Sequence, residues 1–428
     1  MKIHMDLDCF FASCERTQNS VLLGKPIAVG GRSDMHIFEK GYSKRKLYSQ
    51  NRGAFVPNVF YSDKRASCTQ TENYFFDKTN HKTKIRGIIT TASYEARAYK
   101  IKTGMSVNEA LQLCPKLIVL PPHHLLYHEF SHHLAQFLAT KIPLLEQYSI
   151  DEFFGDLSGW VKDEDMVSYC ENLRDEIMRR FNLPISFGIA QSKWAAKLAT
   201  THAKPFGVCQ IKPKDWGDFI HKMKIEQFPG IAKGYKKRLN ARGIETLGDI
   251  KEAKALFYSW KKPGIQLYKR VQGIDEEPIR QVHSRKSIGI SRTFDPIRKR
   301  DEVLRRAVIL ARNLTYTTLC LGLNPTTYYM KIRYEVGLKE EFRISVERLF
   351  HERFFKALVI EMFSKIDKHQ PQAIKYIGLS VSNFMEYKSR PYDLLHFDQD
   401  TKHNKLGHSI QTLRDKYGID VVKTANEI

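Results

Sequence analysis

The order of strand-like and helix-like segments is the feature that most constrains the fold of this chain. Beyond residue 287, segments with the two-residue apolar period of strands alternate with segments that have a helical period. The order is strand, helix, strand, strand, helix, strand, over residues 287–294, 301–319, 326–336, 341–346, 351–366 and 374–384. A β-α-β-β-α-β order is typical of a self-contained ferredoxin-like unit.

The first half of the chain also alternates strands with helices, and a hairpin is predicted over residues 147–157. This pattern predicts a sheet flanked by helices, so the fold class is mixed α/β (α+β). Residues 213–275 differ, because glycines divide them into short helical pieces. The polar stretch that follows, up to residue 286, is predicted to be a linker.

Basic residues exceed acidic residues by 69 to 47, which gives the 428 residues a formal net charge of +22. This excess favours a polyanionic partner, with nucleic acid ahead of an acidic membrane surface. The seven cysteines include no C-x-x-C pair, which argues against a zinc knuckle or a disulfide framework. No apolar run could span a bilayer and the N-terminus is unlike a signal peptide, so we predict a cytoplasmic protein without a membrane partner.

Acidic residues in apolar surroundings are the strongest chemical signal. Asp6 and Asp8 lie near the end of the first predicted strand, and Asp151 and Glu152 are adjacent within the predicted hairpin. Neighbouring carboxylates repel one another and are costly to bury unless a cation neutralises them. Hard oxygen ligands of this kind suit Mg²⁺, and two such ions can promote in-line displacement at phosphorus. Solvated surface carboxylates are the alternative, which the apolar neighbours of Asp6 disfavour.

A tyrosine and two basic residues complement these acids. Tyr94 and Arg97 are three residues apart and would project from one face of a helix, while Lys204 lies between a helix and a Pro-Phe-Gly turn. Guanidinium and ammonium groups suit phosphate oxygens. Taken singly, each of them also fits a solvated surface cation.

Four motifs occur in the order found in Y-family DNA polymerases, the lesion-bypass enzymes that include bacterial DNA polymerase IV. They are M-D-L-D-C-F-F-A (5–12), T-A-S-Y-E-A-R (91–97), Y-S-I-D-E (148–152) and A-K-P-F-G (203–207). The resemblance extends from residue 2 to about residue 423. It implies template-directed addition of a dNTP to a primer 3′-hydroxyl, with release of pyrophosphate.

The resemblance also implies roles for individual residues. Asp6 and Asp151 would bind two Mg²⁺ ions together with the Leu7 carbonyl, and Glu152 would complete the catalytic site; Asp8 matches the family strand but receives no ligand role. Phe11 would be the steric gate that excludes a ribose 2′-hydroxyl. The residues implied to bind the dNTP are Phe10, Phe11, Thr91, Tyr94, Arg97 and Lys204.

The implied architecture is a right-hand polymerase with a ferredoxin-like palm, small fingers, a helical thumb and a β-α-β-β-α-β little finger. The predicted boundaries are 1–10 and 122–212 for the palm, 11–121 for the fingers, 213–275 for the thumb, 276–286 for the linker, 287–395 for the little finger and 396–428 for a C-terminal tail.

Two segments are expected to bind primer–template DNA. Residues 228–243 resemble a helix-hairpin-helix that would contact a phosphate through Gly230, Lys233 and Lys236, although Ala232 stands where the family usually has glycine. Residues 280–300 carry seven basic residues and one acid, and Arg285, Lys286 and Arg292 are expected to follow the DNA backbone.

Residues 32–86 depart from the family, whose members join the flanking strands with only a few residues. This insertion has 12 basic and five acidic residues and nine Phe or Tyr. Rings interleaved with cations suit single-stranded nucleic acid, and we hypothesise that the insertion contacts the template. The alternative is an accessory subdomain that packs on the fingers.

The tail segment Asp393–Phe397 (D-L-L-H-F) lies where relatives carry a sliding-clamp-binding peptide, but Asp and His replace two residues of that motif. The sequence therefore leaves clamp binding open. The histidines at 123, 124, 128, 132 and 133 are interpreted as a solvated helix face rather than a zinc site.

A monomeric polymerase is the function that these observations favour. Two alternatives remain at this point. One is a metal-dependent nucleotidyl cyclase or nuclease, which would not need the hairpin or the basic C-terminal domain. The other is a catalytically inert DNA-binding relative, which the intact acids argue against.

Overall fold

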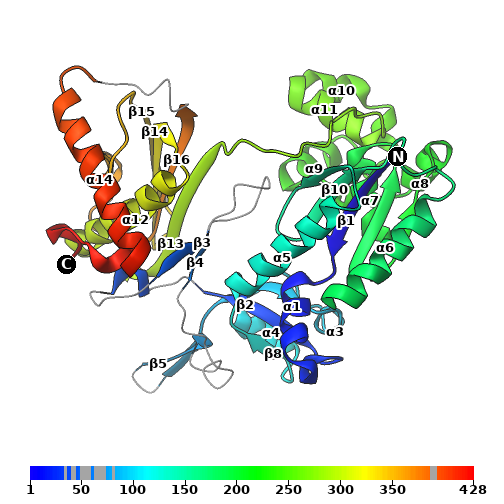
Figure 1. The fold of residues 1–428 in the computed structure, drawn as a ribbon, viewed down its shortest axis with the longest axis horizontal. Helices are drawn as coiled ribbons and strands as arrows, with labels where there is room; N and C mark the ends of the chain where they lie inside the picture. Colours follow the sequence, from blue (N-terminus) through cyan, green and yellow to red (C-terminus); the bar gives the residue numbers. More distant parts are fainter. Residues whose placement is uncertain (33–35, 40–44, 49–58, 62–73, 80–81, 386–392) are drawn as a thin grey trace. The chain divides into compact units, whose positions relative to one another are not determined.

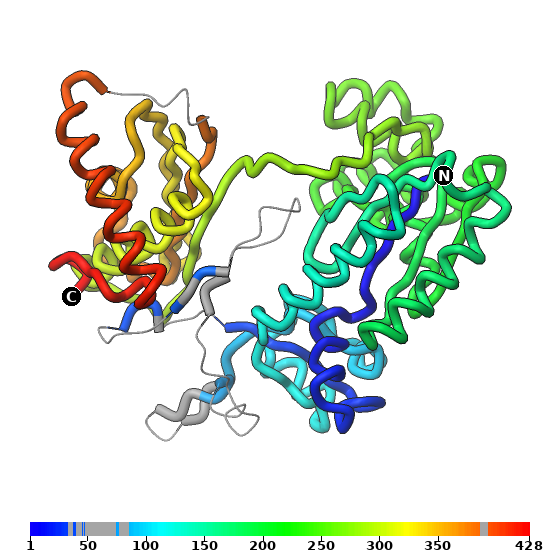
Figure 2. The backbone as a smooth tube through the Cα atoms, viewed as in Figure 1, coloured from blue at the N-terminus to red at the C-terminus, as the bar shows by residue number. Residues whose placement is uncertain are grey.

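The computed structural model describes residues 1–32, 36–39, 45–48, 59–61, 74–79, 82–385 and 393–428. The chain divides into two compact units, whose backbone is traced in Figures 1 and 2. The N-terminal unit comprises residues 1–30, 52–56 and 88–283, and the C-terminal unit comprises residues 31–51, 57–87 and 284–428. No helix in the described part of the chain is long and apolar enough to cross a membrane.

The main sheet of the N-terminal unit has five strands in the order β12-β11-β1-β10-β9. The central strand β1 pairs antiparallel with both β10 and β11. The strands are β1 (Lys2–Leu7), β9 (Leu144–Gln147), β10 (Glu152–Asp156), β11 (Ile185–Ala190) and β12 (Val208–Gln210). The hairpin predicted over residues 147–157 is confirmed, because β9 and β10 are antiparallel neighbours.

Helices cover both faces of this sheet. Ile3, Met5 and Leu7 of β1 pack in one core with side chains of α5 (His124–Ala139) and α6 (Met166–Phe181). The alternate residues of β1 point to the other face, where His4 Nδ1 lies 2.8 Å from the Thr200 hydroxyl of α7 (Lys193–Ala203). Asp6 has the same parity as His4, so the fold presents it on the α7 side.

A glycine in β11 lets α7 approach the sheet closely. A Cβ added at Gly188 would lie 2.1 Å from the Ala196 carbonyl oxygen and 2.3 Å from the Thr200 nitrogen. Only a residue without a side chain fits here, so Gly188 sets the spacing between α7 and the strands. The lysines of α7 consequently come within reach of the acids on β1 and β10.

Two smaller parts complete the N-terminal unit. A three-stranded sheet of order β7-β2-β8 contains β2 (Ile27–Gly31), β7 (Ile88–Ala92) and β8 (Ile118–Leu120), with α1 (Phe10–Gln18), α3 (Tyr94–Arg97) and α4 (Val107–Leu113) nearby in the chain. A helical part with its own core follows the main sheet, as the glycine-broken sequence predicts. Its helices are α8 (Trp216–His221), α9 (Lys233–Asn240), α10 (Lys254–Ser259) and α11 (Lys261–Val271).

The C-terminal unit confirms the predicted β-α-β-β-α-β order. Its four antiparallel strands are arranged β13-β16-β14-β15, and α12 and α13 share a hydrophobic core with them. The elements are β13 (Ser287–Ile297), α12 (Arg300–Cys320), β14 (Asn324–Tyr334), β15 (Lys339–Ser345), α13 (Glu352–Ile366), β16 (Ile374–Met385) and α14 (Phe397–Tyr417).

Residues 31–51 and 57–87 also belong to the C-terminal unit. The sequence places residues 32–86 with the fingers, so this grouping differs from that expectation. Within the described part of the insertion lie the short helix η2 (His36–Phe38) and two antiparallel pairs, β3 (Lys46–Tyr48) with β4 (Val59–Tyr61) and β5 (Phe76–Thr79) with β6 (Lys82–Ile85). Much of the insertion lies outside the described residues.

Candidate active site

Two neighbouring strands bring the predicted acids together. Asp6 of β1 lies opposite Glu152 of β10 in the antiparallel register. Asp151 directly precedes β10, and its carbonyl oxygen accepts a hydrogen bond of 3.0 Å from the Leu7 nitrogen. We call Asp6, Asp151 and Glu152 the acid cluster. The hairpin that closes at Ser149 therefore carries two of its three members back to the end of β1.

Asp8 belongs to a different network. It is buried, and its carboxylate accepts hydrogen bonds from the Tyr94 hydroxyl at 3.0 Å, the Ser186 hydroxyl at 2.9 Å and the Phe206 nitrogen at 2.7 Å. Because both oxygens are engaged, Asp8 joins β1, α3 and the turn after α7. This arrangement suits a positioning role better than a ligand role.

The acid cluster retains more negative charge than its surroundings neutralise. Burial raises the pKa of Asp6 to about 7; Lys204 acts against this shift, while Asp151 and Glu152 add to it. Burial also raises the pKa of Asp151, against the hydrogen bond of 2.5 Å that its carboxylate accepts from the Ser149 hydroxyl. Raised carboxylate pKa values in a cluster of this kind indicate a place for additional positive charge.

Two lysines approach the acid cluster from α7 and its C-terminal end. Lys204 Nζ lies 2.5 Å from Asp6 Oδ1, and Lys197 Nζ lies 2.5 Å from Glu152 Oε1. Lys204 is among the predicted residues, but Lys197 is not. No local pattern marks Lys197, because α7 also contains Lys193, two threonines and a histidine.

The other predicted nucleotide-binding residues lie on β7 and α3. Thr91 is in β7, and Ser93 caps α3 by accepting a hydrogen bond from the Ala96 nitrogen. The Arg97 guanidinium lies 5.1 Å from the centre of the Tyr94 ring, and its Nε donates to the Ala92 carbonyl. The Tyr94 hydroxyl donates a hydrogen bond to the Asp8 carboxylate. Lys204 Nζ lies 4.0 Å from the same carboxylate, so Asp8 connects Tyr94 with Lys204.

Phe11 stands on a second aromatic ring. Its ring is stacked on Tyr127 of α5, with centroids 4.3 Å apart and planes 13° from parallel. The buried Tyr127 donates a hydrogen bond of 2.5 Å from its hydroxyl to Glu15 Oε1. Phe10, by contrast, is buried in the hydrophobic core, so only its backbone is available for the predicted contact with a nucleotide.

The donor set fits a divalent cation in its chemistry. The acid cluster offers carboxylate oxygens, which are the ligands that Mg²⁺ prefers. Among the described residues, no three His, Cys, Asp or Glu side chains are already arranged as ligands of one ion. Lys204 Nζ contacts one oxygen of Asp6, and Lys197 Nζ contacts one oxygen of Glu152.

The histidines of α5 form no metal site among the described residues either. His128 is buried, contrary to the predicted solvated face.

The predicted hairpin of the helical part is present. Gly230 adopts a φ of +102°, which favours glycine, and α9 begins three residues later at Lys233. Ile231 and Leu239 are buried beneath it. Lys233 is exposed, whereas Lys236 forms an ion pair of 2.8 Å with Glu226.

The sheet of the C-terminal unit has one face covered by helices and one face lined with basic and aromatic residues. Tyr328, Met330 and Ile332 of β14 lie in the core, so the alternate residues Lys331 and Arg333 point to the opposite face. Arg333 stacks on Tyr376 of β16, with its guanidinium 4.0 Å from the ring centre. Sequence reasoning missed these two cations, although the period of β14 places them together.

Arg292 differs from its predicted setting. It pairs with Ile377, which in turn pairs with Ile332, and both partners belong to the helix-covered core. Its register therefore places Arg292 in the row of the covered face rather than in the row of Lys331 and Arg333. Arg285 and Lys286 precede β13, and burial lowers the pKa of Arg285.

Comparison with known proteins gives concordant results. The impB/mucB/samB family matches residues 66–201, and the C-terminal domain of the same family matches residues 285–394. A DNA polymerase IV of Dehalococcoides mccartyi is 26% identical over 429 residues, which cover 99% of this chain and 96% of the relative. A DNA polymerase IV of Serratia proteamaculans is 31% identical over 295 residues, which cover 68% of this chain and 69% of the relative.

Solved structures show the same fold. A Y-family DNA polymerase chimera of Dbh and Dpo4 superposes with a TM-score of 0.69 at 23% identity, covering 90% of this chain and 99% of the chimera. DinB from Sulfolobus solfataricus gives a TM-score of 0.53 at 22% identity, covering 90% and 98% of the two chains. The match to the Serratia enzyme, together with the two impB/mucB/samB matches, shows that this chain belongs to the Y family of DNA polymerases.

Proposed function

We propose that this Y-family polymerase extends a primer by phosphoryl transfer at the acid cluster, with two Mg²⁺ ions as cofactors. The observation that carries the proposal is the convergence of Asp6, Asp151 and Glu152 on adjacent strands, with a pKa of about 7 for Asp6. Asp6, Asp151, Glu152 and the Leu7 carbonyl would hold the ions. Bound there, they would supply charge neutralisation and a more acidic primer hydroxyl.

The reaction is an in-line displacement. The primer 3′-hydroxyl oxygen forms a bond to the α-phosphorus of the dNTP as the bond from that phosphorus to the bridging oxygen breaks. Pyrophosphate leaves, and the hydroxyl proton passes to solvent. The protein contributes mainly by positioning and by charge, because the substrates themselves supply the reacting bonds.

Lys204, Tyr94, Arg97 and Thr91 are the residues that we propose for the triphosphate. Lys204 is paired with Asp6 here, and a cation at Asp6 would release its ammonium to a phosphate oxygen. Arg97 carries a guanidinium whose geometry suits phosphate oxygens. The network from Asp8 through Tyr94 holds α3 against β1, so these groups are preorganised around one edge of the sheet.

Phe11 is the residue that we propose for sugar selection. Its stacking on Tyr127 restricts the ring, and the bond from Tyr127 to Glu15 in α1 restrains the supporting ring in turn. A ring held from behind cannot retreat from a 2′-hydroxyl, which is the property that a steric gate needs. Tyr127 would act here as a positioning residue.

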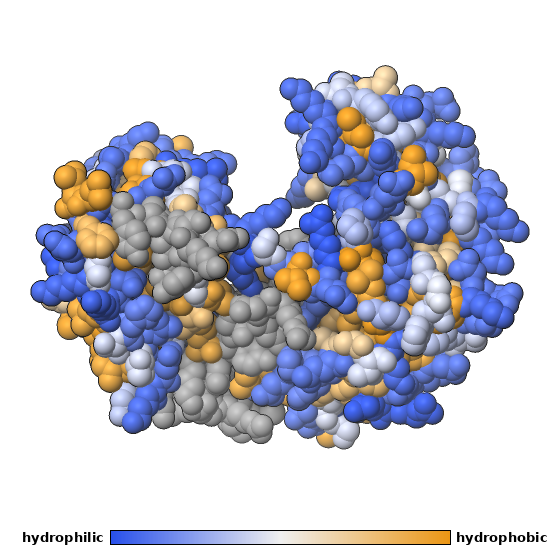
Figure 3. Space-filling model, turned by 45° about the horizontal axis from the view of Figure 1, so that its top comes forward, coloured by the Kyte–Doolittle hydropathy of each residue, from blue (hydrophilic) through white to orange (hydrophobic). Residues whose placement is uncertain are grey.

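Primer–template DNA would bind to two basic surfaces. The hairpin at Gly230 and Lys233 can contact a phosphate through backbone N–H groups and charge, with Lys236 beside it. In the C-terminal unit, Lys331 and Arg333 line the sheet face opposite the helices, and Arg285 and Lys286 precede the edge strand. Hydrophilic side chains cover most of the described surface visible in Figure 3, as expected for contacts to a phosphate backbone.

Clamp binding by the segment Asp393–Phe397, which the sequence leaves open, is a further part of the proposal. Leu394 and Leu395 are each 91% exposed, and Phe397 is 45% exposed. Exposed apolar side chains on a short segment suit insertion into a groove of a partner. Binding of an immobilised bacterial sliding clamp by the full chain, and its loss in Leu395→Ala, would test this role.

Primer extension with Mg²⁺ tests the central proposal. The wild type should extend a primer–template, and Asp151→Ala should lose extension, since its carboxylate would hold the ions. Asp218→Ala, which removes an exposed carboxylate from α8, is the matched control and should behave like the wild type. Equal extension by Asp151→Ala and the wild type would reject the proposed site, and the absence of extension by the wild type would favour the inert relative.

A further inference from the structure

Part of the insertion is built into the hydrophobic core of the C-terminal unit. Ile37 and Phe38 are only 2% and 4% exposed, and they belong to the same core cluster as Phe294 of β13 and Val303 of α12. The Phe38 and Phe294 rings meet edge to face with centroids 6.2 Å apart. This contact joins residues that are more than 250 positions apart in the chain.

Two arginines of α12 fix this contact. The Arg306 guanidinium lies 4.8 Å from the ring centres of both Phe38 and Phe294. Arg305 donates a hydrogen bond of 2.9 Å from Nη2 to the Phe38 carbonyl oxygen. The backbone and the side chain of Phe38 are therefore both recognised, which indicates a specific seat rather than general apolar burial.

A buried ion pair forms a second contact. Arg45 is 5% exposed, and its Nη2 lies 3.0 Å from Asp420 Oδ2, whose side chain is also buried. The Ile419 nitrogen donates a hydrogen bond of 3.2 Å to the Arg45 carbonyl oxygen. Asp420 is held in turn by Arg312 of α12 at 2.8 Å. The insertion thus shares one charge network with the C-terminal segment of the chain.

The returning end of the insertion makes a third contact. Arg86 donates from both guanidinium nitrogens to the Asp295 carboxylate of β13, at 3.0 and 2.7 Å. Its backbone nitrogen donates to the Phe75 carbonyl, and Arg32 at the other end donates to the Tyr74 carbonyl. Both ends of the insertion therefore bond to the backbone of Tyr74 and Phe75 before the chain re-enters β7.

We propose that the described parts of residues 31–51 and 57–87 form a docking segment, seated in the C-terminal unit, which joins that unit to the N-terminal unit independently of the linker. The segment leaves from β2 and returns to β7, which are neighbouring strands of the N-terminal unit. It is thus covalently anchored in one unit while its described side chains are seated in the other. Among the described residues, the chain passes between the units after residues 30, 87 and 283.

Burial leaves two of the described aromatic residues unavailable for the hypothesised contact with the template. Phe38 and Phe75 are 4% and 1% exposed, so neither ring presents a face on which a base could stack. The docking segment does not depend on the polymerase chemistry, and it can be tested without it.

Cutting the linker tests the proposal directly. A recognition sequence for a site-specific protease is inserted between His283 and Ser284, at the boundary between the units, and the purified full chain is cleaved. Nuclease treatment and about 0.5 M salt remove bridging nucleic acid, since contacts to phosphate weaken steeply with salt. The fragments 1–283 and 284–428 should still elute together in gel filtration, because the first fragment carries the docking segment.

Variants of the seat should release the second fragment. Phe38→Ala with Arg45→Ala should raise the dissociation constant of the cleaved pair at least tenfold, and Phe38→Leu with Arg45→Lys should have a smaller effect. Trp160→Ala with Arg179→Ala, which removes an exposed ring and an exposed cation, is the matched control. Circular dichroism of each uncleaved variant checks that it is folded.

A second variant guards against misfolding of the first. Deletion of residues 32–86, with Gly31 joined to Gly87, removes the segment as a whole and should also separate the cleaved fragments. Separation of the cleaved wild-type fragments would overturn the proposal. So would retention of fragment 284–428 by folded Phe38→Ala, Arg45→Ala protein or by the deletion variant.

Discussion

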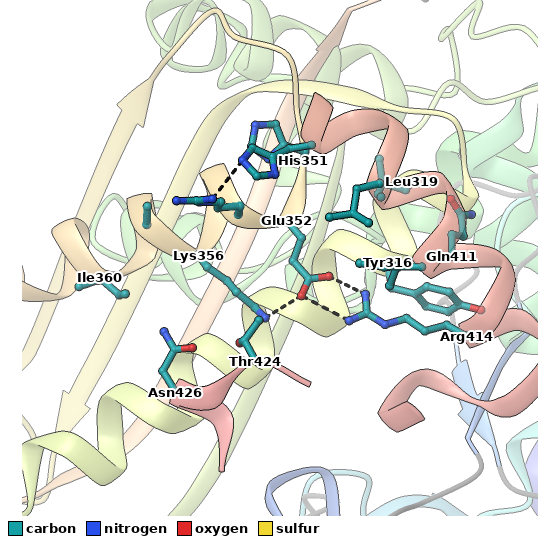
Figure 4. Close-up of a pocket in the computed structure, with 16 residues that line it drawn as sticks. Tyr316, Leu319, His351, Glu352, Lys356, Ile360, Gln411, Arg414, Thr424 and Asn426 are labelled. Carbon is teal, nitrogen blue, oxygen red and sulfur yellow. Dashed lines mark hydrogen bonds and ion pairs between the residues drawn. The ribbon is translucent and has the colours of Figure 1, made fainter. Parts of the chain in front are cut away.

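Groups of carboxylates with little exposure occur in both units of the molecule, but the network around Glu427 in the C-terminal unit and the acid cluster of the N-terminal unit balance their charge differently. In the C-terminal unit, Glu427 is paired with Arg312 and Lys356, each at 2.5 Å. Asp420 is paired with Arg312 and Arg45. Glu352 lies between Lys356 at 2.6 Å and Arg414 at 2.5 Å, beside a cavity of about 460 Å³ (Figure 4). Every one of these carboxylates contacts two cations.

The acid cluster of the N-terminal unit has fewer cations than carboxylates. Lys204 contacts Asp6 and Lys197 contacts Glu152, while the Asp151 carboxylate accepts from the Ser149 hydroxyl. The pKa values follow this difference. Burial alone would raise the pKa of Glu427, but Arg312 and Lys356 lower it, whereas burial raises the pKa of Asp6 to about 7 despite Lys204.

The difference separates charge that the fold neutralises from charge that it leaves for a ligand. In the C-terminal unit, ion pairs neutralise Glu427 and Asp420 and hold the C-terminal segment against α12 and α13, so the charge is balanced within the chain. An acid cluster that is short of cations is costly to the folded protein, and such a cost is typical of functional sites. Substitutions in the two regions should therefore have opposite effects on stability.

The largest effect is expected for Asp6→Asn, which should lower primer extension by about 10³-fold, since a group that stabilises charge in the transition state is lost. The same change should stabilise the metal-free protein by ~1–2 kcal/mol at pH 8, because it removes a buried carboxylate whose pKa is raised. Extension assays and thermal unfolding in EDTA measure the two effects. Asp218→Asn is the control for both, and a loss of stability in Asp6→Asn would remove the contrast between the units.

Glu427→Gln should have the opposite signature. Loss of this carboxylate leaves Arg312 and Lys356 buried with fewer partners, and breaking a buried pair costs about 3–5 kcal/mol. Unfolding of the C-terminal unit, followed by far-ultraviolet circular dichroism, should shift to lower temperature. Extension at a temperature where the variant is folded should match the wild type. The exposed Glu361, paired with Lys365, supplies the control Glu361→Gln, for which little change is expected.

The sequence predicts the acid cluster better than its environment. Asp6 and Asp151 are recognisable because each is a charge inside an apolar stretch, and the pairing of β1 with β10 brings them together. Lys197 acquires its role only when Gly188 lets α7 approach the sheet, which no local pattern shows. The seat of Phe38 on Phe294 depends on a contact across most of the chain length. The sequence did not indicate that Arg292 lies in the row of the helix-covered face, because the position of β13 relative to the core fixes its parity.

The contributions of the two sets of carboxylates to the pH dependence of stability should differ in sign. Glu427 and Glu352 have lowered pKa values in the folded state, so their stabilisation is complete above their ordinary value of 4.5 and is lost as pH falls below it. Asp6 has a raised pKa, so the metal-free N-terminal unit is destabilised as pH rises from about 4 to 7. Burial also lowers the pKa of His4, His124 and His128, which destabilises the same unit as pH falls below 6.5, so the contribution of Asp6 must be isolated by comparison with Asp6→Asn. Between pH 7 and pH 5.5 in EDTA, the N-terminal unit of the wild type should gain ~1 kcal/mol relative to that of Asp6→Asn, while the C-terminal units of the two proteins should not diverge.

The four tryptophans make this prediction measurable. All of them, at positions 160, 194, 216 and 260, lie in the N-terminal unit, so tryptophan fluorescence reports on that unit alone. Circular dichroism reports on both units. If the difference between the wild type and Asp6→Asn changes equally in the two signals between pH 7 and pH 5.5, the units share one charge balance, contrary to the comparison.

The smallest effect is expected for a cation that the fold leaves without a carboxylate partner among the described residues, and it should be seen in DNA binding. Arg312 forms ion pairs with two carboxylates. Arg333 instead stacks on Tyr376 at the sheet face opposite the helices, and its charge faces outwards. Arg333→Ala should weaken binding of primer–template DNA by a few-fold and should reduce the dependence of log K on log salt by about one, as for loss of one phosphate contact. Fluorescence anisotropy at several salt concentrations measures both quantities. Arg292→Ala is the matched comparison. Because Arg292 lies in the row of the helix-covered face, the salt dependence of DNA binding by this variant should stay closer to that of the wild type. A larger effect of Arg292→Ala would place the DNA along β13 instead.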